Sequence, residues 1–293
     1  MFKNKKYVIG VSGGPDSMAL LDMYKDQVKV VCHVNYHFRK DSNLDQELVK
    51  QYCLTHNLEL RIKEIDPKVY KQSFNFENFA RKERYSFFRQ IANEYGLNDL
   101  LLAHHLDDHI ETCLMQYNKK SLTTFYGIKQ NNIVNCLKVF RPLLNKRKSE
   151  LIAYCNQHNI KYAIDTTNND LRFERNKIRF QLSKLTDQEF KQLVNKFKQL
   201  NQDLNDLDQA TNAKYAVWTN KQFNTCYLLN QKPQLQIHLV YRFLINFIPF
   251  RITKNKINSI IKFIASNKSN TFFRLNNGYY LHKKNKYLTI LKK

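Results

Sequence analysis

Residues 6–17 read KYVIGVSGGPDS, an apolar run that passes into a short segment of glycine and serine. Three of the chain's six glycines, Gly10, Gly13 and Gly14, fall within five positions here. Glycine is required where the backbone takes unusual dihedral angles or approaches another group closely. The apolar run predicts a buried parallel strand, and the residues from Asp16 onward predict the first turns of a helix. Amide groups and the positive end of a helix dipole meet at such a turn, which favours phosphate binding; an ordinary strand-to-helix turn is the alternative.

Strands and helices alternate along the rest of the N-terminal half. Strands are predicted over residues 28–35, 58–65 and 99–104, and helices over residues 41–56, 76–95 and 106–117. This alternation is typical of an α/β fold with a doubly wound, mostly parallel sheet. Ligands bind beyond the carboxyl ends of the strands in such sheets, and Ser12, Asn35 and His105 follow three of these ends. The pattern therefore predicts one site built from these turns.

Side chains around the glycine turn add polar ligands to that site. Ser12 and Ser17 offer hydroxyl donors, and Asp16 is a candidate ligand for Mg²⁺, which neutralises phosphate charge. The end of the second predicted strand, from His33 to Asn35, is where the base of a nucleotide bound at the first turn is expected. A hydrogen-bonded core histidine is the alternative for His33.

Residues 104–112, HHLDDHIET, carry the densest set of reactive side chains in the chain. His105 and His109 are four residues apart and Asp108 and Glu111 are three apart, so each pair shares one face of the predicted helix. Two imidazoles and a carboxylate fit a zinc or manganese site. The carboxylate pair equally fits a pocket for a cationic substrate, and acids at a helix start are also stabilised by the dipole alone. The spacing leaves all three interpretations open.

Two basic segments supply candidate phosphate ligands. The helix predicted over residues 76–95 contains Arg81 and Arg84, which either stabilise charge on a transferring phosphoryl group or form surface pairs with Glu77. Residues 171–179 contain four more Lys or Arg residues, which either grip phosphates or form a solvated face.

The charge of the chain is strongly positive and unevenly distributed. The formal net charge is +23, and after Asp208 there is no carboxylate in 85 residues, although 15 Lys or Arg residues remain. A charge of this size favours a polyanionic partner such as a nucleic acid. A solubilising basic surface or a coding bias toward lysine is the alternative, but neither removes every acid from a third of the chain.

Cysteine usage and hydropathy bear on the compartment. The six cysteines, at positions 32, 53, 113, 136, 155 and 226, form no C-x-x-C pair. This spacing predicts reduced thiols in a cytoplasmic protein and argues against structural zinc or an iron–sulfur cluster. No apolar run approaches the ~20 residues that span a bilayer, so we expect no membrane partner.

Composition and periodicity predict three parts. Residues 1–186 are the expected catalytic domain, residues 187–212 a linker helix, and residues 213–293 a smaller, basic domain of helical or α+β type. The alternative for the linker is a core helix of the first domain. In the last part we expect helices over residues 235–247 and 254–266, followed by a hairpin at Asn277-Gly278.

Several sequence blocks resemble one enzyme family. The string SGGPDS is similar to the PP-loop of the ATP-pyrophosphatase superfamily, which has an adenine nucleotide alpha hydrolase-like fold, whereas neither Gly-Lys-Ser/Thr nor G-x-G-x-x-G occurs. Together the blocks SGGPDSMALL, HVNYHFR, NFENFARKERYSFF, AHHLDDHIETCLM, FRPLL and IDTTNNDLRFERNKIR resemble the tRNA(Ile)-lysidine synthetase family. The resemblance implies ATP-dependent ligation of free L-lysine to C2 of the wobble cytidine of tRNA(Ile) with anticodon CAU. It also implies an adenylated tRNA intermediate, release of AMP and pyrophosphate, and a C-terminal domain that binds the tRNA anticodon loop and stem.

The resemblance further implies roles for individual residues. It places phosphate binding on Ser12, Gly13, Gly14, Asp16 and Ser17, and the lysine site on Asp108 and Glu111. From their positions and chemistry we add Pro15, His33 and Asn35 to the expected ATP site, Asp16 as the Mg²⁺ ligand and Arg84 as the group that stabilises charge at the α-phosphate. The expected catalytic residues are then Asp16, Arg84, Asp108 and Glu111. Support of the active site or of the tRNA falls on His105, Asp107, Arg175, Asn176 and Arg179.

The chain departs from the family pattern at three places. His109 stands where the family usually has glutamine, residues 36–39 replace a His-Gly-Leu-Arg segment, and residues 118–128 replace a glycine-rich segment. These departures leave the shape of the 118–128 loop open. The rival interpretations are another PP-loop RNA modifier such as a tRNA thiolase, an amide-forming PP-loop enzyme, and a catalytically inactive RNA-binding protein.

Overall fold

The structure, a computed structural model, describes residues 5–38, 42–70, 76–119, 122–163, 174–250 and 252–292. The chain divides into two compact units, Met1–Met115 with Gly127–Leu185 and Gln116–Tyr126 with Thr186–Lys293. Residues 165–168 and Arg172 of the last family block, and Arg39 of the second, lie outside the described residues.

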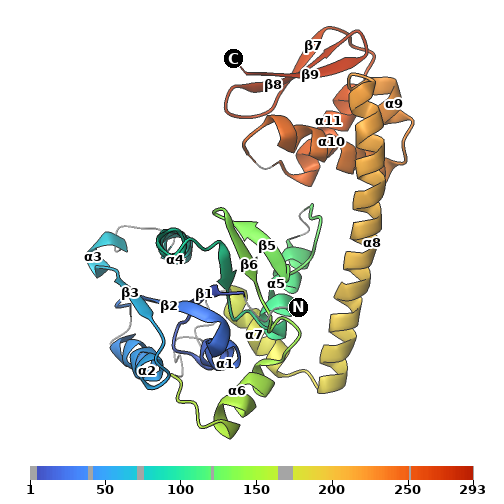
Figure 1. The fold of residues 1–293 in the computed structure, drawn as a ribbon. Coiled ribbons are helices and arrows are strands. Elements are labelled where there is room, and N and C mark those ends of the chain that lie inside the picture. The colour runs from blue at the N-terminus through green and yellow to red at the C-terminus, as the bar shows by residue number, and fades with distance from the viewer. Residues whose placement is uncertain are drawn as a thin grey trace. The chain divides into compact units, whose positions relative to one another are not determined.

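A six-stranded sheet forms the centre of the first unit (Figure 1). Its strands are β1 (Tyr7–Gly10), β2 (Val28–Asn35), β3 (Leu60–Glu64), β4 (Asp99–Leu101), β5 (Asn131–Val134) and β6 (Leu137–Phe140). They lie in the order β3-β2-β1-β4-β6-β5, and only β5 pairs in the antiparallel sense. The predicted doubly wound, mostly parallel sheet is confirmed, and the β5–β6 hairpin adds an edge that the sequence did not indicate.

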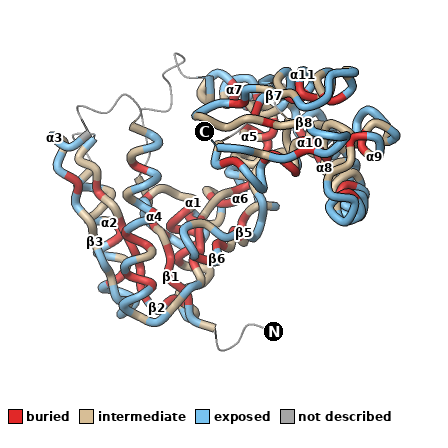
Figure 2. The backbone as a smooth tube through the Cα atoms, turned by 90° about the horizontal axis from the view of Figure 1, so that it is seen from above, coloured by how far each residue is buried: buried red, intermediate tan, exposed pale blue. Residues whose placement is uncertain are grey.

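Helices cover both faces of this sheet. They are α1 (Pro15–Tyr24), α2 (Ser42–Thr55), α3 (Pro67–Tyr70), α4 (Phe76–Glu94), α5 (Leu106–Asn118), α6 (Lys148–Gln157) and α7 (Glu174–Ser183). Side chains alternate along β1, so Ile9 packs with α1, α2 and α6, while Val8 packs with α4 on the other face. Both are fully buried, which fits the apolar sequence of this strand. Figure 2 shows buried residues gathered along the strands at the centre of this unit.

The turn after β1 requires glycine at two positions. A Cβ atom on Gly10 would lie 2.7 Å from the Phe88 ring of α4, so glycine allows that helix to approach the strand end. Gly13 has φ +92°, and a Cβ atom there would lie 3.0 Å from the backbone oxygen of Asp45. These two glycines hold the start of α1 at the carboxyl edge of the sheet.

Asp22 joins three helices on one side of the sheet. Its carboxylate accepts hydrogen bonds from Tyr52 of α2 at 2.5 Å, Tyr154 of α6 at 2.6 Å and Lys25 at 2.9 Å. Burial works against the charge on Asp22, but these bonds outweigh it and lower the pKa of Asp22 to about 2.

We expect Asp22→Asn to lower the free energy of unfolding by about 1–3 kcal/mol at pH 7, because two partly buried hydroxyl groups lose a charged acceptor. The folded-state pKa lies below the unfolded value, so this stabilisation is present above pH ~4 and is lost as the pH falls through 2. Urea unfolding should therefore separate the two proteins most at pH 7 and by a smaller difference at pH 3. Asp26→Asn, at an exposed carboxylate close by, is the matched control; equal losses in both variants would contradict the role of Asp22.

The second unit is helical with a small antiparallel sheet, as predicted. Its elements are α8 (Asp187–Asn220), α9 (Thr225–Leu229), α10 (Pro233–Phe247), α11 (Lys254–Ala265), β7 (Thr271–Arg274), β8 (Tyr279–Lys284) and β9 (Tyr287–Lys292). The fully buried Trp218 lies in its core with Phe243. Helix α8 continues past the predicted end of the linker, and α9 and β9 were not predicted. None of the described helices is long and apolar enough to cross a membrane.

Candidate active site

A cavity of about 550 Å³ opens at the carboxyl ends of β1 and β2, beside the start of α5. The predicted site residues that line it are Ser12, Gly14, Asp16, Ser17, His33, Asn35, Arg84, Asp108, Arg175 and Arg179. Gly13, Pro15, His105, Asp107, Glu111 and Asn176 are not among its lining residues. The structure thus brings the glycine turn, one acid of the predicted pair and three arginines to a single cavity.

The glycine turn is held by its own hydroxyl groups. Ser17 Oγ lies 3.1 Å from Ser12 Oγ, accepts a hydrogen bond from the Ser12 amide at 3.1 Å and donates to the Gly14 carbonyl at 3.0 Å. Gly14 is the N-cap of α1 and has no side chain to fill the helix start. The first turn of α1 is therefore open to an anion, and the two hydroxyl groups hold the turn in place beside it.

His33 and Asn35 are buried at the end of β2. The His33 ring Nδ1 lies 2.9 Å from the Val11 carbonyl, and burial lowers the pKa of His33 although this hydrogen bond opposes the shift. The Asn35 amide donates to Asn43 and to Gln46, both at 3.0 Å, while its oxygen accepts from the His37 amide at 2.9 Å. Both side chains thus shape the wall of the cavity through contacts with the protein itself.

His105 lies between three carboxylates. Its Nε2 is 3.5 Å from Asp16 Oδ2 and 3.3 Å from Asp108 Oδ2, and its Nδ1 is 3.6 Å from Asp107 Oδ2. Burial opposes a charge on His105, but hydrogen bonds to Asp107 and Asp16 and the charge of Asp108 outweigh it and raise the pKa of His105 to about 9. A protonated His105 therefore fixes the spacing of the three acids. Asp107 in turn accepts from Arg147 and from the Lys148 amide at the start of α6.

Asp16 has one oxygen that suits a metal ion. Oδ1 is buried and has no hydrogen-bond partner in the part of the chain that the structure describes. Such an oxygen is costly to bury unless a cation or donor satisfies it. Hard cations such as Mg²⁺ prefer carboxylate oxygens, so the residue present fits the Mg²⁺ ligand that the sequence suggested.

Arginines from α7 neutralise the acidic pair on α5. Arg175 Nε donates to Glu111 Oε1, and Arg179 Nε donates to Glu111 Oε2 at 2.8 Å. Arg175 also reaches Asp108 Oδ1 at 3.5 Å. Burial disfavours the charge on Arg175, but Glu111 and Asp108 outweigh it and raise the pKa of Arg175. Asp108 lines the cavity and Glu111 lies behind it, only 2% exposed.

The two histidines proposed as metal ligands diverge. His105 contacts the acids described above, whereas His109 Nδ1 accepts a hydrogen bond from the Ile128 amide at 3.1 Å. Among the described residues, no group of three or more His, Cys, Asp or Glu side chains is arranged to hold a metal ion. The zinc or manganese interpretation is therefore not supported, and His109 anchors the end of the 118–128 loop to α5 instead.

Sequence reasoning missed a buried arginine beside the cavity. Arg141 follows β6, is 3% exposed, and donates to the Lys129 carbonyl at 2.8 Å, to Asn132 Oδ1 at 2.6 Å and to His104 Nδ1 at 3.3 Å. Arginine only donates, so His104 Nδ1 must accept and Nε2 carries the proton. Burial lowers the pKa of His104 to about 4, so a neutral donor lines the cavity. The only signal in the sequence was that Arg141 lies in the block FRPLL, and this position does not show that the side chain is buried.

Comparison with known proteins agrees with this geometry. The PP-loop domain family model matches residues 1–186. The tRNA(Ile)-lysidine synthase of Ureaplasma parvum is 39% identical over 284 residues, which cover 95% of this chain and 85% of the relative. That of Mycoplasma genitalium is 36% identical over 298 residues and covers 100% of both chains.

Among solved structures, the U34-tRNA thiolase NcsA from Methanococcus maripaludis aligns with a TM-score of 0.53 and 20% identity, covering 69% of this chain and 73% of that one. At this identity the likeness concerns the fold alone. The relatives matched over most of their length decide between the interpretations, and the chain belongs to the tRNA(Ile)-lysidine synthase family of tRNA-modifying ligases.

Proposed function

We propose that this chain uses ATP to join free L-lysine to C2 of the wobble cytidine of tRNA(Ile) with a CAU anticodon. The observation that carries the assignment to these residues is that the glycine turn, Asp16 and Asp108 line one cavity. A triphosphate and an ammonium group are thereby offered complementary charges within one space, with Asp16 and Asp108 linked through His105.

The first step activates the cytidine. The C2 carbonyl oxygen attacks the α-phosphorus of ATP, and the bond to pyrophosphate breaks. The glycine turn, with Ser12 and Ser17, holds the outgoing phosphates at the start of α1. Arg84, which lines the cavity from α4, stabilises the charge that develops at the α-phosphate. Asp16 would hold Mg²⁺ through its buried oxygen, and the ion supplies further neutralisation of the triphosphate.

The second step forms the carbon–nitrogen bond. The lysine ε-amine attacks C2 only when it is neutral, so its proton must pass to a nearby base. We propose that Asp108, the acid at the cavity, faces the ammonium group and accepts this proton, and that Glu111 acts from behind it, because both of its oxygens already accept hydrogen bonds from Arg175 and Arg179. The C2–O bond then breaks and AMP leaves with the oxygen.

We infer that the second unit binds the tRNA. Every carboxylate of the chain precedes residue 209, so the 15 Lys and Arg residues beyond it meet no acid of their own segment. Backbone phosphates are the expected counter-charges, and binding should weaken steeply with salt. An anticodon loop is single-stranded, which allows its wobble base to enter a protein cavity.

Incorporation of labelled lysine into total tRNA tests the function. We expect label only with ATP and Mg²⁺, and Asp16→Asn should reduce it at least about 100-fold, because the triphosphate loses its metal ligand and His105 loses a counter-charge. Asp26→Asn, an exposed acid in the same region, should leave incorporation unchanged. A fully active Asp16→Asn protein would remove Asp16 from the mechanism, and a wild-type protein that incorporates no lysine would refute the function.

A further inference from the structure

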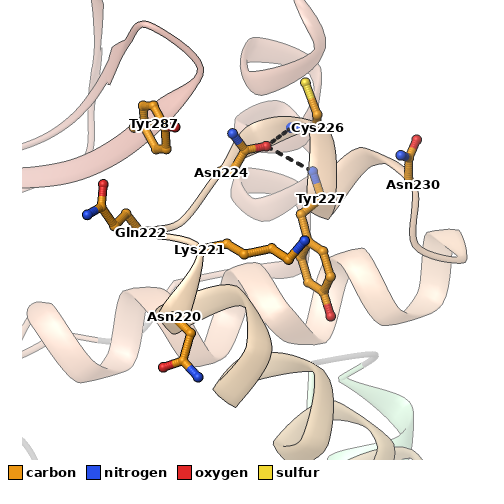
Figure 3. Close-up of a pocket in the computed structure, with 8 residues that line it drawn as sticks. All are labelled: Asn220, Lys221, Gln222, Asn224, Cys226, Tyr227, Asn230 and Tyr287. Carbon is orange, nitrogen blue, oxygen red and sulfur yellow. Dashed lines mark hydrogen bonds between the residues drawn. The ribbon is translucent and has the colours of Figure 1, made fainter.

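A second hollow, of about 520 Å³, lies in the C-terminal unit at the corner between α8 and α9 (Figure 3). It is lined by carboxamide groups of Asn220, Gln222 and Asn230, by two tyrosines, Tyr227 and Tyr287, and by Lys221. No acidic side chain lines it. None of these residues lines the catalytic cavity.

The walls of the hollow are fixed by backbone contacts. Asn224 caps α9 by accepting hydrogen bonds from the amides of Cys226 and Tyr227, drawn as dashed lines in Figure 3. The Asn224 carbonyl accepts from the buried Trp218 ring at 2.8 Å, and the Thr225 amide donates to the Lys286 carbonyl at 2.7 Å. The α8–α9 corner and the β8–β9 turn are therefore joined, and the hollow is preformed.

The lining carboxamides retain their hydrogen-bonding capacity. In the described part of the chain, the side chains of Asn220, Gln222 and Asn230 make no hydrogen bond, in contrast to Asn224. Each carboxamide offers a carbonyl acceptor and two N–H donors. Donors and acceptors of this kind match the edge of a nucleobase, which also presents both.

Aromatic and basic groups accompany these amides. Tyr287 is 42% exposed, and Lys221 Nζ lies 5.4 Å from the centre of the Tyr227 ring. Along the outer face of the sheet, Lys284 pairs with Tyr287, and two residues before it His282 stacks on Phe272 with ring centres 4.3 Å apart and an angle of 9°. Rings interleaved with lysines form the usual platform for unpaired nucleotides.

We propose that this hollow binds one unpaired nucleobase of the tRNA, with the base on Tyr287, its edge on the carboxamides and its phosphate near Lys221. The inference rests on the proposed function for the identity of the RNA. The positive charge of the segment attracts an acidic peptide as well as RNA. The exposed aromatic rings and the carboxamides without hydrogen bonds favour a nucleobase. An unpaired nucleotide is required, because a base inside a helix does not expose its face.

The test uses the full-length protein and measures tRNA affinity together with steady-state kinetics. Tyr287→Ala should raise the Kd and the KM for tRNA about 10-fold while leaving kcat and the KM for lysine unchanged, since loss of one stacked base typically weakens binding by this order. The double variant Asn220→Ala/Asn230→Ala should also raise the Kd, and Tyr287→Phe should restore wild-type binding. Lys221→Ala should reduce the slope of log Kd against log salt by about one.

Controls separate this inference from the function itself. Asn258→Ala changes an exposed carboxamide on α11 and should leave the Kd unchanged. Crosslinking of tRNA that contains 4-thiouridine should join an unpaired nucleotide to the hollow. A wild-type protein that makes lysidine while all hollow variants bind tRNA normally would overturn the inference alone, as would crosslinks confined to paired stem nucleotides.

Discussion

Asp108→Asn should raise the KM for lysine about 100-fold or more, with the KM for ATP changed less than about threefold. Asp108 is the acid of the α5 pair that lines the cavity, and its side chain is 14% exposed. Removing one member of a desolvated charge pair costs about 2–5 kcal/mol, and each 1.4 kcal/mol corresponds to about tenfold in affinity. Because the triphosphate site proposed at the glycine turn uses other atoms, the KM for ATP should change little.

One further variant and one substrate analogue show whether the effect belongs to lysine binding. Glu77 contacts Arg175 at 3.4 Å, as Asp108 does at 3.5 Å, but its side chain is 78% exposed. Glu77→Gln should therefore leave the KM for lysine near the wild-type value. A neutral amine as long as lysine should also fail to restore the activity of the Asp108→Asn protein. An unchanged KM for lysine in Asp108→Asn would place the amino-acid site elsewhere in the protein.

The sequence predicted those parts of the fold that local patterns determine. Strand β2 occupies the residues predicted for it, and α4 and α5 begin where their apolar periodicity begins. The β5–β6 hairpin was missed because Asn131 and Asn132 interrupt any alternation, and its pairing depends on the long-range contact of β6 with β4. Strand β9 was missed because the turn that leads into it, Asn285-Lys286, has positive φ at both residues but contains no glycine to indicate a hairpin.

The sequence named many of the residues that line the cavity, but not how their side chains are connected. Asp16, Arg84 and Asp108 lie in motifs whose chemistry is legible along the chain. The position of Glu111 behind Asp108 depends on how α7 packs against α5, and this packing brings together side chains 64 residues apart. Whether a charged side chain is buried also depends on the folded chain. For this reason the sequence did not single out Arg141.

Arg141→Met should lower the free energy of unfolding by about 3–5 kcal/mol, because the Lys129 carbonyl, Asn132 Oδ1 and His104 Nδ1 all lose a buried charged donor. Any folded fraction should also show an altered pH profile. The charge of Asp108 raises the pKa of His104, whereas burial and the charges of Arg141, Arg84 and Arg175 lower it. Without Arg141 the pKa of His104 should rise from about 4, so a reaction that needs the neutral ring at the cavity wall should show its acid limb of kcat/KM for tRNA at higher pH.

Asn132→Ala distinguishes positioning of His104 from simple loss of stability. It removes one acceptor of Arg141 at 2.6 Å and leaves the guanidinium beside His104. We expect a smaller destabilisation, about 1–2 kcal/mol, and an acid limb at the wild-type pH. Arg141→Lys keeps a charge at the position but lacks the fixed fork of donors. Compared with Arg141→Met, it should bring the acid limb close to its wild-type pH but recover less of the free energy of unfolding. Acid limbs that coincide in all three variants would mean that Arg141 supports the fold without setting the protonation of His104.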